Sequence, residues 1–171
     1  RIYLFRHQYV YEFNPTDNNG KGSYTAKTSP PSGTGKKWAT CAYVNVNGED
    51  RVYIIGGTNS ANVFTNTNYY YMPATDTWST AQAAAPYAAQ GVTRDNPSYN
   101  GKIYFGYGWG GFNFYNGLYC YDPATDTWSA ELATGIARDG GSCGFVGNTL
   151  YYIGGRNVNA NPYGLAYNEA Y

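Results

Sequence analysis

The sequence predicts an all-β protein assembled from repeated units of four short strands, and three observations support this prediction. Aromatic residues make up 19% of the 171 residues, with 21 Tyr among them, a composition that favours strands over helices. The 22 Gly and 8 Pro supply the tight turns that short strands require. The heptapeptide PATDTWS occurs twice, starting at Pro73 and at Pro123, and this defines a period of 50 residues.

The same order of strand signals recurs around each heptapeptide. An apolar run ending in glycine reads VYIIGG at residues 52–57, IYFGYG at residues 103–108 and LYYIGG at residues 150–155. A Tyr-containing run follows, NYYYMPATDTW at residues 68–78 and LYCYDPATDTW at residues 118–128. Weaker versions of that run read YVYEFNPTD at residues 9–17 and LAYNEA at residues 165–170, so four copies are detectable.

A glycine pair, then Tyr, then Trp seven residues after that Tyr, resembles the kelch repeat, in particular its bacterial form YDPATDTW. The resemblance covers nearly the whole chain and implies a β-propeller of four-stranded antiparallel kelch blades. Kelch propellers have six or seven blades, whereas about 3.5 blades are present in this chain. The resemblance therefore implies an incomplete ring, completed by further blades from the rest of the chain or from other subunits.

The template divides the whole chain, residues 1–171, into a partial blade at residues 1–35, complete blades at residues 38–88 and 89–135, and a partial blade at residues 136–171. We expect the chain to open on a second strand at residues 2–5 and to close on a third strand at residues 165–167. The chain lacks an initiator Met, so we also expect the true N-terminus to be missing.

Eight residues of the repeat are predicted to be structural. Residues 52–55 and 150–153 are apolar throughout, which indicates strands buried on both faces. The glycine pairs are predicted to take positive φ or to approach a neighbouring chain closely, and Tyr107, which replaces one glycine, predicts a different local geometry there. The eight residues are Gly56, Gly57, Tyr71, Trp78, Tyr121, Trp128, Gly154 and Gly155.

The PATDTW segment predicts a hairpin turn. Pro presets φ at its start, and Asp76 and Asp126 are predicted to accept hydrogen bonds from nearby backbone amides in an Asx-type turn. Trp78 and Trp128 then fall on the outer strand, where an indole can pack between adjacent blades.

Candidate ligand-binding residues lie in the loops at the strand ends, because loops vary freely while blades are packed. One set is charged: Arg6, His7, Arg94, Asp95, Arg138, Asp139 and Arg156. A ring of Arg side chains can hold a carboxylate, although adjacent Arg and Asp also form solvated pairs or hydrogen bonds between blades. The second set is aromatic, either exposed for contact with a sugar or protein or packed on the blade below: Trp109, Phe112, Phe114 and Tyr115.

Charge and composition exclude several classes of function. Charged residues make up 13% of the chain, with 11 basic against 11 acidic side chains, which disfavours nucleic acid as a partner. No apolar stretch is long enough for membrane insertion. The lone His7 and the scattered Cys41, Cys120 and Cys143 form no metal-binding pattern, so no metal or cofactor is predicted. We expect these cysteines to pack in strands, with a disulfide as the alternative.

The sequence therefore predicts a non-catalytic binding or assembly module that recognises a protein or a carbohydrate through its loops. Its neutral polar surface suggests an extracellular or cell-surface location, as part of a larger assembly. Two alternatives stay open. One is an enzyme of the kelch-type sialic acid mutarotase class, which needs only acid, base and Arg side chains, and the other is a purely structural subunit of an oligomer or filament.

Overall fold

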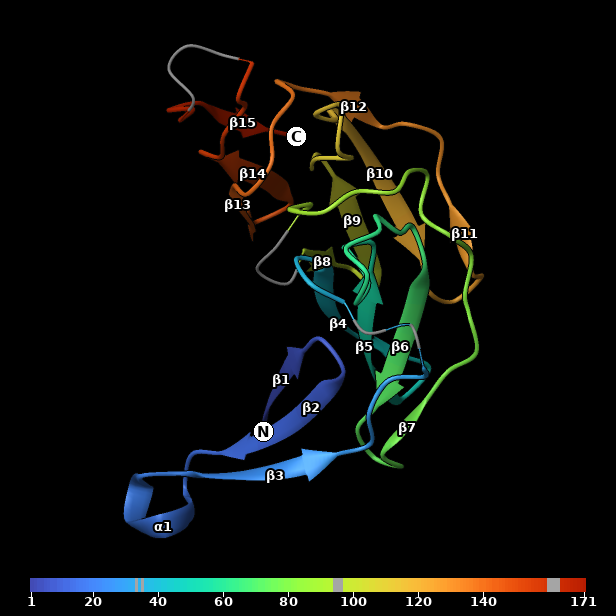
Figure 1. Ribbon diagram of the computed structural model, residues 1–171, viewed down its shortest axis with the longest axis vertical. Coiled ribbons are helices and arrows are strands. Elements are labelled where there is room, and N and C mark those ends of the chain that lie inside the picture. The colour runs from blue at the N-terminus through green and yellow to red at the C-terminus, as the bar shows by residue number, and fades with distance from the viewer. Residues whose placement is uncertain (33, 35, 94–96, 160–163) are drawn as a thin grey trace.

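The computed structural model describes residues 1–171 except 33, 35, 94–96 and 160–163, and it consists of four antiparallel sheets arranged in an arc (Figure 1). We name the sheets the first to fourth blade in chain order. The first blade contains β1 (Ile2–Arg6), β2 (Tyr9–Asn14) and β3 (Ser23–Lys27), with a short helical turn α1 (Asp17–Gly20) before β3. The second blade contains β4 (Thr40–Val46), β5 (Glu49–Ile55), β6 (Asn68–Met72) and β7 (Thr77–Trp78).

The third and fourth blades repeat this order. The third contains β8 (Ser98–Tyr99), β9 (Lys102–Gly106), β10 (Gly117–Asp122) and β11 (Thr127–Trp128), and β12 (Ala133–Thr134) pairs with β10 as an addition. The fourth contains β13 (Ser142–Val146), β14 (Thr149–Ile153) and β15 (Asn168–Ala170). The all-β, four-stranded blade predicted from the sequence is thereby confirmed. In the described part of the chain, no helix has the length and apolar character needed to cross a bilayer.

Both end blades lack one strand of the four-strand pattern. β1 ends at the position of the glycine pair, so it corresponds to β5, and the first blade has no counterpart of the inner strand β4. The chain closes on a third strand as predicted, but the predicted location at residues 165–167 is wrong, because β15 pairs with β14 at Asn168–Ala170. Tyr171 then stands where Tyr71 and Tyr121 stand in the complete blades.

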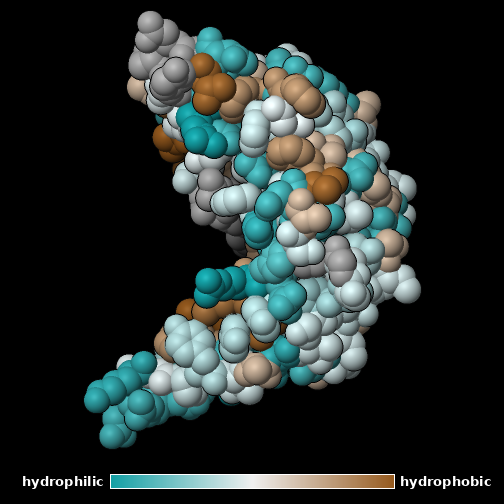
Figure 2. All heavy atoms as spheres, in the orientation of Figure 1, coloured by the Kyte–Doolittle hydropathy of each residue, from teal (hydrophilic) through white to brown (hydrophobic). Residues whose placement is uncertain are grey.

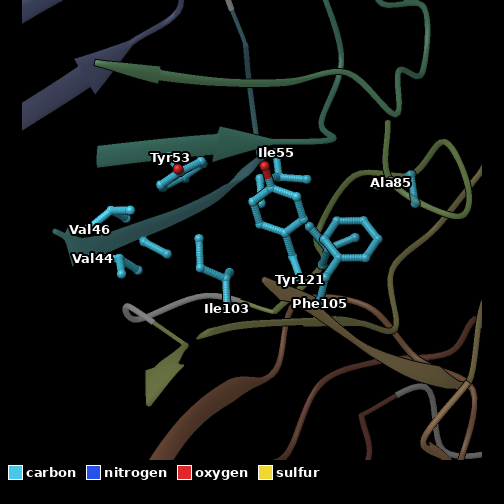
Figure 3. Close-up of a cluster of buried hydrophobic side chains, with 11 residues drawn as sticks. Val44, Val46, Tyr53, Ile55, Ala85, Ile103, Phe105 and Tyr121 are labelled. Carbon is cyan, nitrogen blue, oxygen red and sulfur yellow. The ribbon is translucent and has the colours of Figure 1, made fainter. Parts of the chain in front are cut away.

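The main core lies between the second and third blades. Val44 and Val46 of β4 and Ile55 of β5 pack against Ile103 and Phe105 of β9 (Figure 3). β4 alternates between buried and exposed residues along its whole length, so only one of its faces meets the third blade. Tyr53 and Tyr121 close the cluster with their ring centroids 5.6 Å apart.

The burial of the glycine-ended strands, β5 and β14, depends on whether a blade lies on each side of them. Residues 52–55 are all buried, as predicted for a strand covered on both faces. The same prediction for residues 150–153 is wrong, since Ile153 is 54% exposed and the pattern alternates. Among the described residues of the fourth blade, Val146 is exposed as well, at 71%, so this strand pair has one face without a covering blade.

The glycine-pair positions share one backbone conformation. Gly57 has φ +80°, and a Cβ atom there would lie 2.5 Å from the Lys37 carbonyl oxygen, so both predicted reasons for glycine apply. The predicted difference at Tyr107 is wrong. Its φ is 60°, close to the 70° of Gly56, and its fully buried ring occupies space beside the fourth blade.

An indole and a carboxylate join each complete blade to the blade before it. The Trp128 Nε1–H donates to the Ala83 carbonyl at 2.9 Å, and Asp126 accepts hydrogen bonds from the Ala83 N–H at 2.7 Å and the Tyr121 hydroxyl at 2.7 Å. Trp78, Asp76 and Tyr71 repeat the arrangement on Thr28 of the first blade. The indoles therefore lie between blades as predicted, but the predicted local Asx bonds are wrong, because both carboxylates reach the preceding blade.

Candidate functional site

The candidate site is a rim formed where the connections between blades meet the ends of the inner strands. Three connecting segments, residues 36–38, 89–91 and 138–140, precede the first strands of successive blades. The Gly91 N–H donates to the Trp38 carbonyl at 3.0 Å, and the Gly140 N–H donates to the Gly91 carbonyl at 2.9 Å. These bonds hold the connecting segments side by side, on the concave side of the arc.

In the second, third and fourth blades, the residue directly after the glycine-pair position pairs with one of these connecting segments. Thr58 bridges to Lys37, Trp109 to Gln90, and Arg156 to Asp139, all in antiparallel pairing. The positions of Thr58, Trp109 and Arg156 are thus equivalent in the second, third and fourth blades. Two of these three were candidates from the sequence, and the repeat places both on the rim.

A hollow with a volume of about 570 Å³ opens between these segments. Its lining combines an aromatic ring, an amide, an ion pair and bare backbone at glycines, which provides both stacking and hydrogen-bonding groups. Figure 2 shows the concave outline of the molecule. The lining residues are Trp38, Gln90, Gly91, Asp139, Gly140, Gly155 and Arg156.

Sequence reasoning missed four lining residues of this hollow as site residues, and Trp38 is the largest of them; the others are Gln90, Gly91 and Gly140. Trp38 occupies the position held by Gly91 and Gly140 in the next two blades, and its φ of 53° matches their 62° and 71°. A left-handed backbone is unfavourable for a bulky side chain. The indole is nevertheless 53% exposed. The mismatch between Trp and two glycines in the aligned repeats was the signal that could have revealed it.

The charged candidates differ in their exposure and in whether they reach the hollow. Arg156 keeps an exposed side chain, and its Nε and Nη2 donate to the two carboxylate oxygens of Asp139 at 2.9 and 3.3 Å. That hydrogen bonding raises the pKa of Arg156 above its ordinary value. Arg156 thus reaches the hollow with part of its guanidinium already engaged. Arg94 and Asp95 lie outside the described residues, and Arg6 is exposed at the end of β1.

Arg138 is fully buried and does not reach the hollow. Its Nη1 donates to the Gly154 carbonyl at 3.1 Å, and its guanidinium pairs with Glu169. The rings of Tyr107 and Tyr152 lie 5.2 and 5.1 Å from its Cζ. A ligand at the rim cannot contact this side chain, so the predicted ligand role of Arg138 is replaced by a structural one.

The aromatic candidates form a loop with a packed base and an exposed tip. Tyr115 stacks on Tyr87 with centroids 4.0 Å apart, and Trp109 meets the edge of Phe64 at 5.3 Å. Phe114 is half-buried, whereas Phe112 is 95% exposed. Of the four candidates, Phe112 is the one whose whole ring is available to a partner.

The three cysteines lie on separate strands. Cys41 lies exposed on β4, Cys120 half-buried on β10 and Cys143 buried on β13. Cys41 therefore departs from the expected packing, because its face of β4 points toward the first blade, which lacks an inner strand. Within the described residues, no three His, Cys, Asp or Glu side chains cluster closely enough to hold a metal ion.

Comparison with known proteins agrees with this geometry. Residues 39–82, which span the second blade, match the family model described as the kelch motif. No curated protein matches the chain. A solved structure titled "Structure of YjhT" superposes with a TM-score of 0.70 over 87% of this chain and 52% of that chain, at 21% sequence identity.

The fold is that of an incomplete β-propeller, and its second blade matches the kelch motif. The resemblance drawn from the Gly, Tyr and Trp spacing is therefore confirmed. The chain spans about half the length of the solved structure that it matches.

Proposed function

We propose that this chain is a non-catalytic binding module that recognises a protein or a carbohydrate through its rim loops, within a larger extracellular or surface assembly. The observation that carries the proposal is Phe112, a ring 95% exposed at the tip of the aromatic loop. An exposed aromatic side chain of this kind suits stacking on a sugar ring or insertion into a protein partner.

The base of the loop supports a preorganised contact. The Gly110 N–H donates to the Asn113 carbonyl at 3.0 Å, which closes a tight turn around Phe112. Gly111 packs closely on the ring of Phe64, and Tyr115 is fixed by its stack on Tyr87. Little conformational entropy is then lost when Phe112 meets a partner.

The neighbouring surface extends the contact. Val63, adjacent to Phe64, is 56% exposed, and Trp109 joins this surface to Gln90 in the lining of the hollow. A surface of aromatic rings bordered by polar groups is typical of carbohydrate and protein interfaces.

Two experiments test the proposal. A glycan array that carries neutral and sialylated glycans measures carbohydrate binding. For protein partners, a photoreactive amino acid placed at position 112 of this chain crosslinks whatever contacts the loop. Phe112→Ala should weaken binding at least about tenfold, because truncation of an anchor residue costs 2 kcal/mol or more. Tyr24→Ala is the matched control, since Tyr24 is an aromatic residue that is 64% exposed on β3 of the first blade, outside the aromatic loop. Unchanged binding by Phe112→Ala, or equal loss in the control, would rule out the loop as the contact surface.

A catalytic role is tested separately. We propose that the chain does not catalyse sugar anomerisation, and NMR exchange spectroscopy of N-acetylneuraminate measures this directly. The rate of anomer interconversion should equal the buffer rate at any protein concentration. Acceleration that Arg156→Gln abolishes would contradict the non-catalytic assignment.

A further inference from the structure

A cavity of about 120 Å³ lies between the first and second blades, and the buried Lys36 is one of the residues that line it. Lys36 is 9% exposed, and its ammonium group donates to the hydroxyl oxygens of Thr65, at 2.5 Å, and Thr67. No carboxylate of the described residues forms an ion pair with it. A buried charge is unfavourable unless an opposite charge and hydrogen bonds compensate it.

The fourth blade has a cation at the equivalent position. Lys36 precedes the bridge between Lys37 and Thr58, and Arg138 precedes the matching bridge between Asp139 and Arg156. Both side chains extend toward the segment before the third strand of their blade. Lys36 donates to Thr67, which directly precedes β6. Arg138 donates to the carbonyl of Tyr167 at 3.4 Å, and Tyr167 directly precedes β15.

In the fourth blade a carboxylate compensates the cation. Glu169 pairs with the guanidinium of Arg138 and also accepts hydrogen bonds from the Ile136 N–H at 2.9 Å and the Tyr107 hydroxyl at 3.2 Å. The ring of Tyr152 covers the guanidinium. The site is filled by the protein's own side chains.

The second blade has different residues at these two positions. Strand register aligns Cys41, Ile54 and Tyr69 with Cys143, Tyr152 and Glu169. Ile54 therefore replaces the large ring of Tyr152, and Tyr69 replaces the carboxylate of Glu169. These exchanges leave a cavity beside a cation that lacks a counter-charge, and both Ile54 and Tyr69 line it.

A second polar group of the cavity also lacks a partner. The Nε2 atom of His7 is buried and makes no hydrogen bond with any described residue. His7 lines the same cavity, opposite apolar groups that include Phe5 and Val10. Buried polar atoms of proteins nearly always have a partner, so an orphaned nitrogen here indicates a missing one.

We propose that this cavity binds a small carboxylate, which takes the place that the Glu169 side chain holds in the fourth blade. Lys36 supplies the opposite charge and His7 a hydrogen bond, while Phe5, Val10 and Ile54 contact a short apolar tail. The volume suits a ligand of about four to six non-hydrogen atoms, such as acetate or propionate, since benzene fits a cavity of about 150 Å³. The proposal does not rest on the proposed function, because it uses neither Phe112 nor the hollow lined by Arg156.

NMR of the protein with isotope-labelled lysine tests the site, with acetate and propionate as probes. Both should shift the side-chain resonance of Lys36 saturably, whereas neutral acetamide and added chloride should not. Lys36→Met should weaken acetate binding at least about tenfold, as expected for loss of a charge-assisted contact. Lys37→Met is the matched control and should bind acetate normally, because the Lys37 ammonium group donates to Asn62 and does not line the cavity.

Tyr69→Glu provides an independent arm by installing the carboxylate of the fourth blade. That variant should lose its response to acetate, because its own side chain then pairs with Lys36. If Tyr69→Glu does not fold, the Lys36 and Lys37 variants still decide the outcome. No shift of Lys36 with acetate, an equal shift with chloride or acetamide, or unchanged acetate binding by Lys36→Met would each overturn the proposal.

Discussion

Lys36 links the stability of the folded protein to pH. Burial lowers the pKa of this lysine from 10.5 to about 8. Between these values the unfolded chain binds a proton that the folded chain does not, so this residue makes the free energy of unfolding rise with pH. The slope that it contributes is at most about 1.4 kcal/mol per pH unit. Below pH 8 the full cost of the buried charge is present.

Lys36→Met should therefore be more stable than the original protein at neutral pH, and the difference should shrink as the pH rises from 8 to 10.5. Urea unfolding across this range measures it. Tyrosine and cysteine titrations are common to both proteins and largely cancel in the difference. A stability difference that does not depend on pH would show that Lys36 is not the titrating group.

The left-handed backbone of Trp38 gives a second prediction at the same scale. Trp38→Gly should be more stable than Trp38→Ala by about 1 kcal/mol, because only glycine tolerates this φ without strain. Trp109 is the matched control, since its φ is not positive, and there the Ala variant should be the more stable one. Thermal unfolding of the four variants checks both orders. If Ala is preferred at position 38 as well, the backbone there is not strained.

At the scale of the elements, Trp128 and Asp126 join the third blade to the second, and we expect the effects of substitutions at this joint on stability to be coupled. Asp126→Ala should lower the free energy of unfolding by about 2 kcal/mol, because it leaves the buried Tyr121 hydroxyl without its acceptor. Tyr121→Phe combined with Asp126→Ala should cost less than the sum of the single changes, by about 1 kcal/mol. Denaturant unfolding of the double-mutant cycle measures this.

Thr127→Ala is the control for that cycle, since Thr127 is exposed beside the same joint. It should change the free energy of unfolding by less than about 0.5 kcal/mol. Strict additivity of Asp126→Ala and Tyr121→Phe would mean that the hydroxyl and the carboxylate do not act together.

The spacing of residues in the sequence identified the strands of the blades well, because each strand signal depends on local residues. The Gly, Tyr and Trp positions fixed the order of the strands and their pairing. The partners of Asp76 and Asp126 were not predictable in the same way, since their hydrogen-bond donors, Thr28 and Ala83, lie 48 and 43 residues away. Local turn chemistry suggested an Asx turn, and contact with the preceding blade replaced it.

Prediction of the candidate site was limited for a similar reason. Trp109 was predicted from the dense aromatic loop and Arg156 from its place after the last glycine pair, and the structure places both on the rim. In the sequence, Arg138 and Asp139 look like an Arg–Asp pair on the surface. The partner that holds Arg138 in a buried position is Glu169, which lies 31 residues later and could not be found from local sequence. Trp38 is exposed through a backbone conformation that no local sequence pattern reports.

At the scale of the whole molecule, the two end blades carry uncovered apolar faces. Ile2 and Leu4 on β1 are 52% and 43% exposed, and Val146 and Ile153 on the fourth blade are 71% and 54% exposed. Apolar colour gathers over the first blade on the concave side (Figure 2). Apolar faces of this kind are typically covered by a neighbour.

We therefore expect the chain by itself to associate head to tail, the fourth blade of one copy against the first blade of the next. Analytical ultracentrifugation should show a sedimentation coefficient that rises with concentration. Leu4→Lys should weaken association at least about tenfold by placing a charge in the contact. A monomer at every concentration, with unchanged behaviour of Leu4→Lys, would contradict this expectation.

The hydrogen bond from each indole to the carbonyl of the preceding blade has a consequence for how such a chain can change over generations. The indole recurs with the period, and its acceptor is a backbone carbonyl that any residue supplies, so duplication of one unit copies the attachment together with the blade. A new unit therefore carries its own attachment to the unit before it. The number of blades can thus change by simple gain or loss of repeats, while the residues that hold them together stay the same.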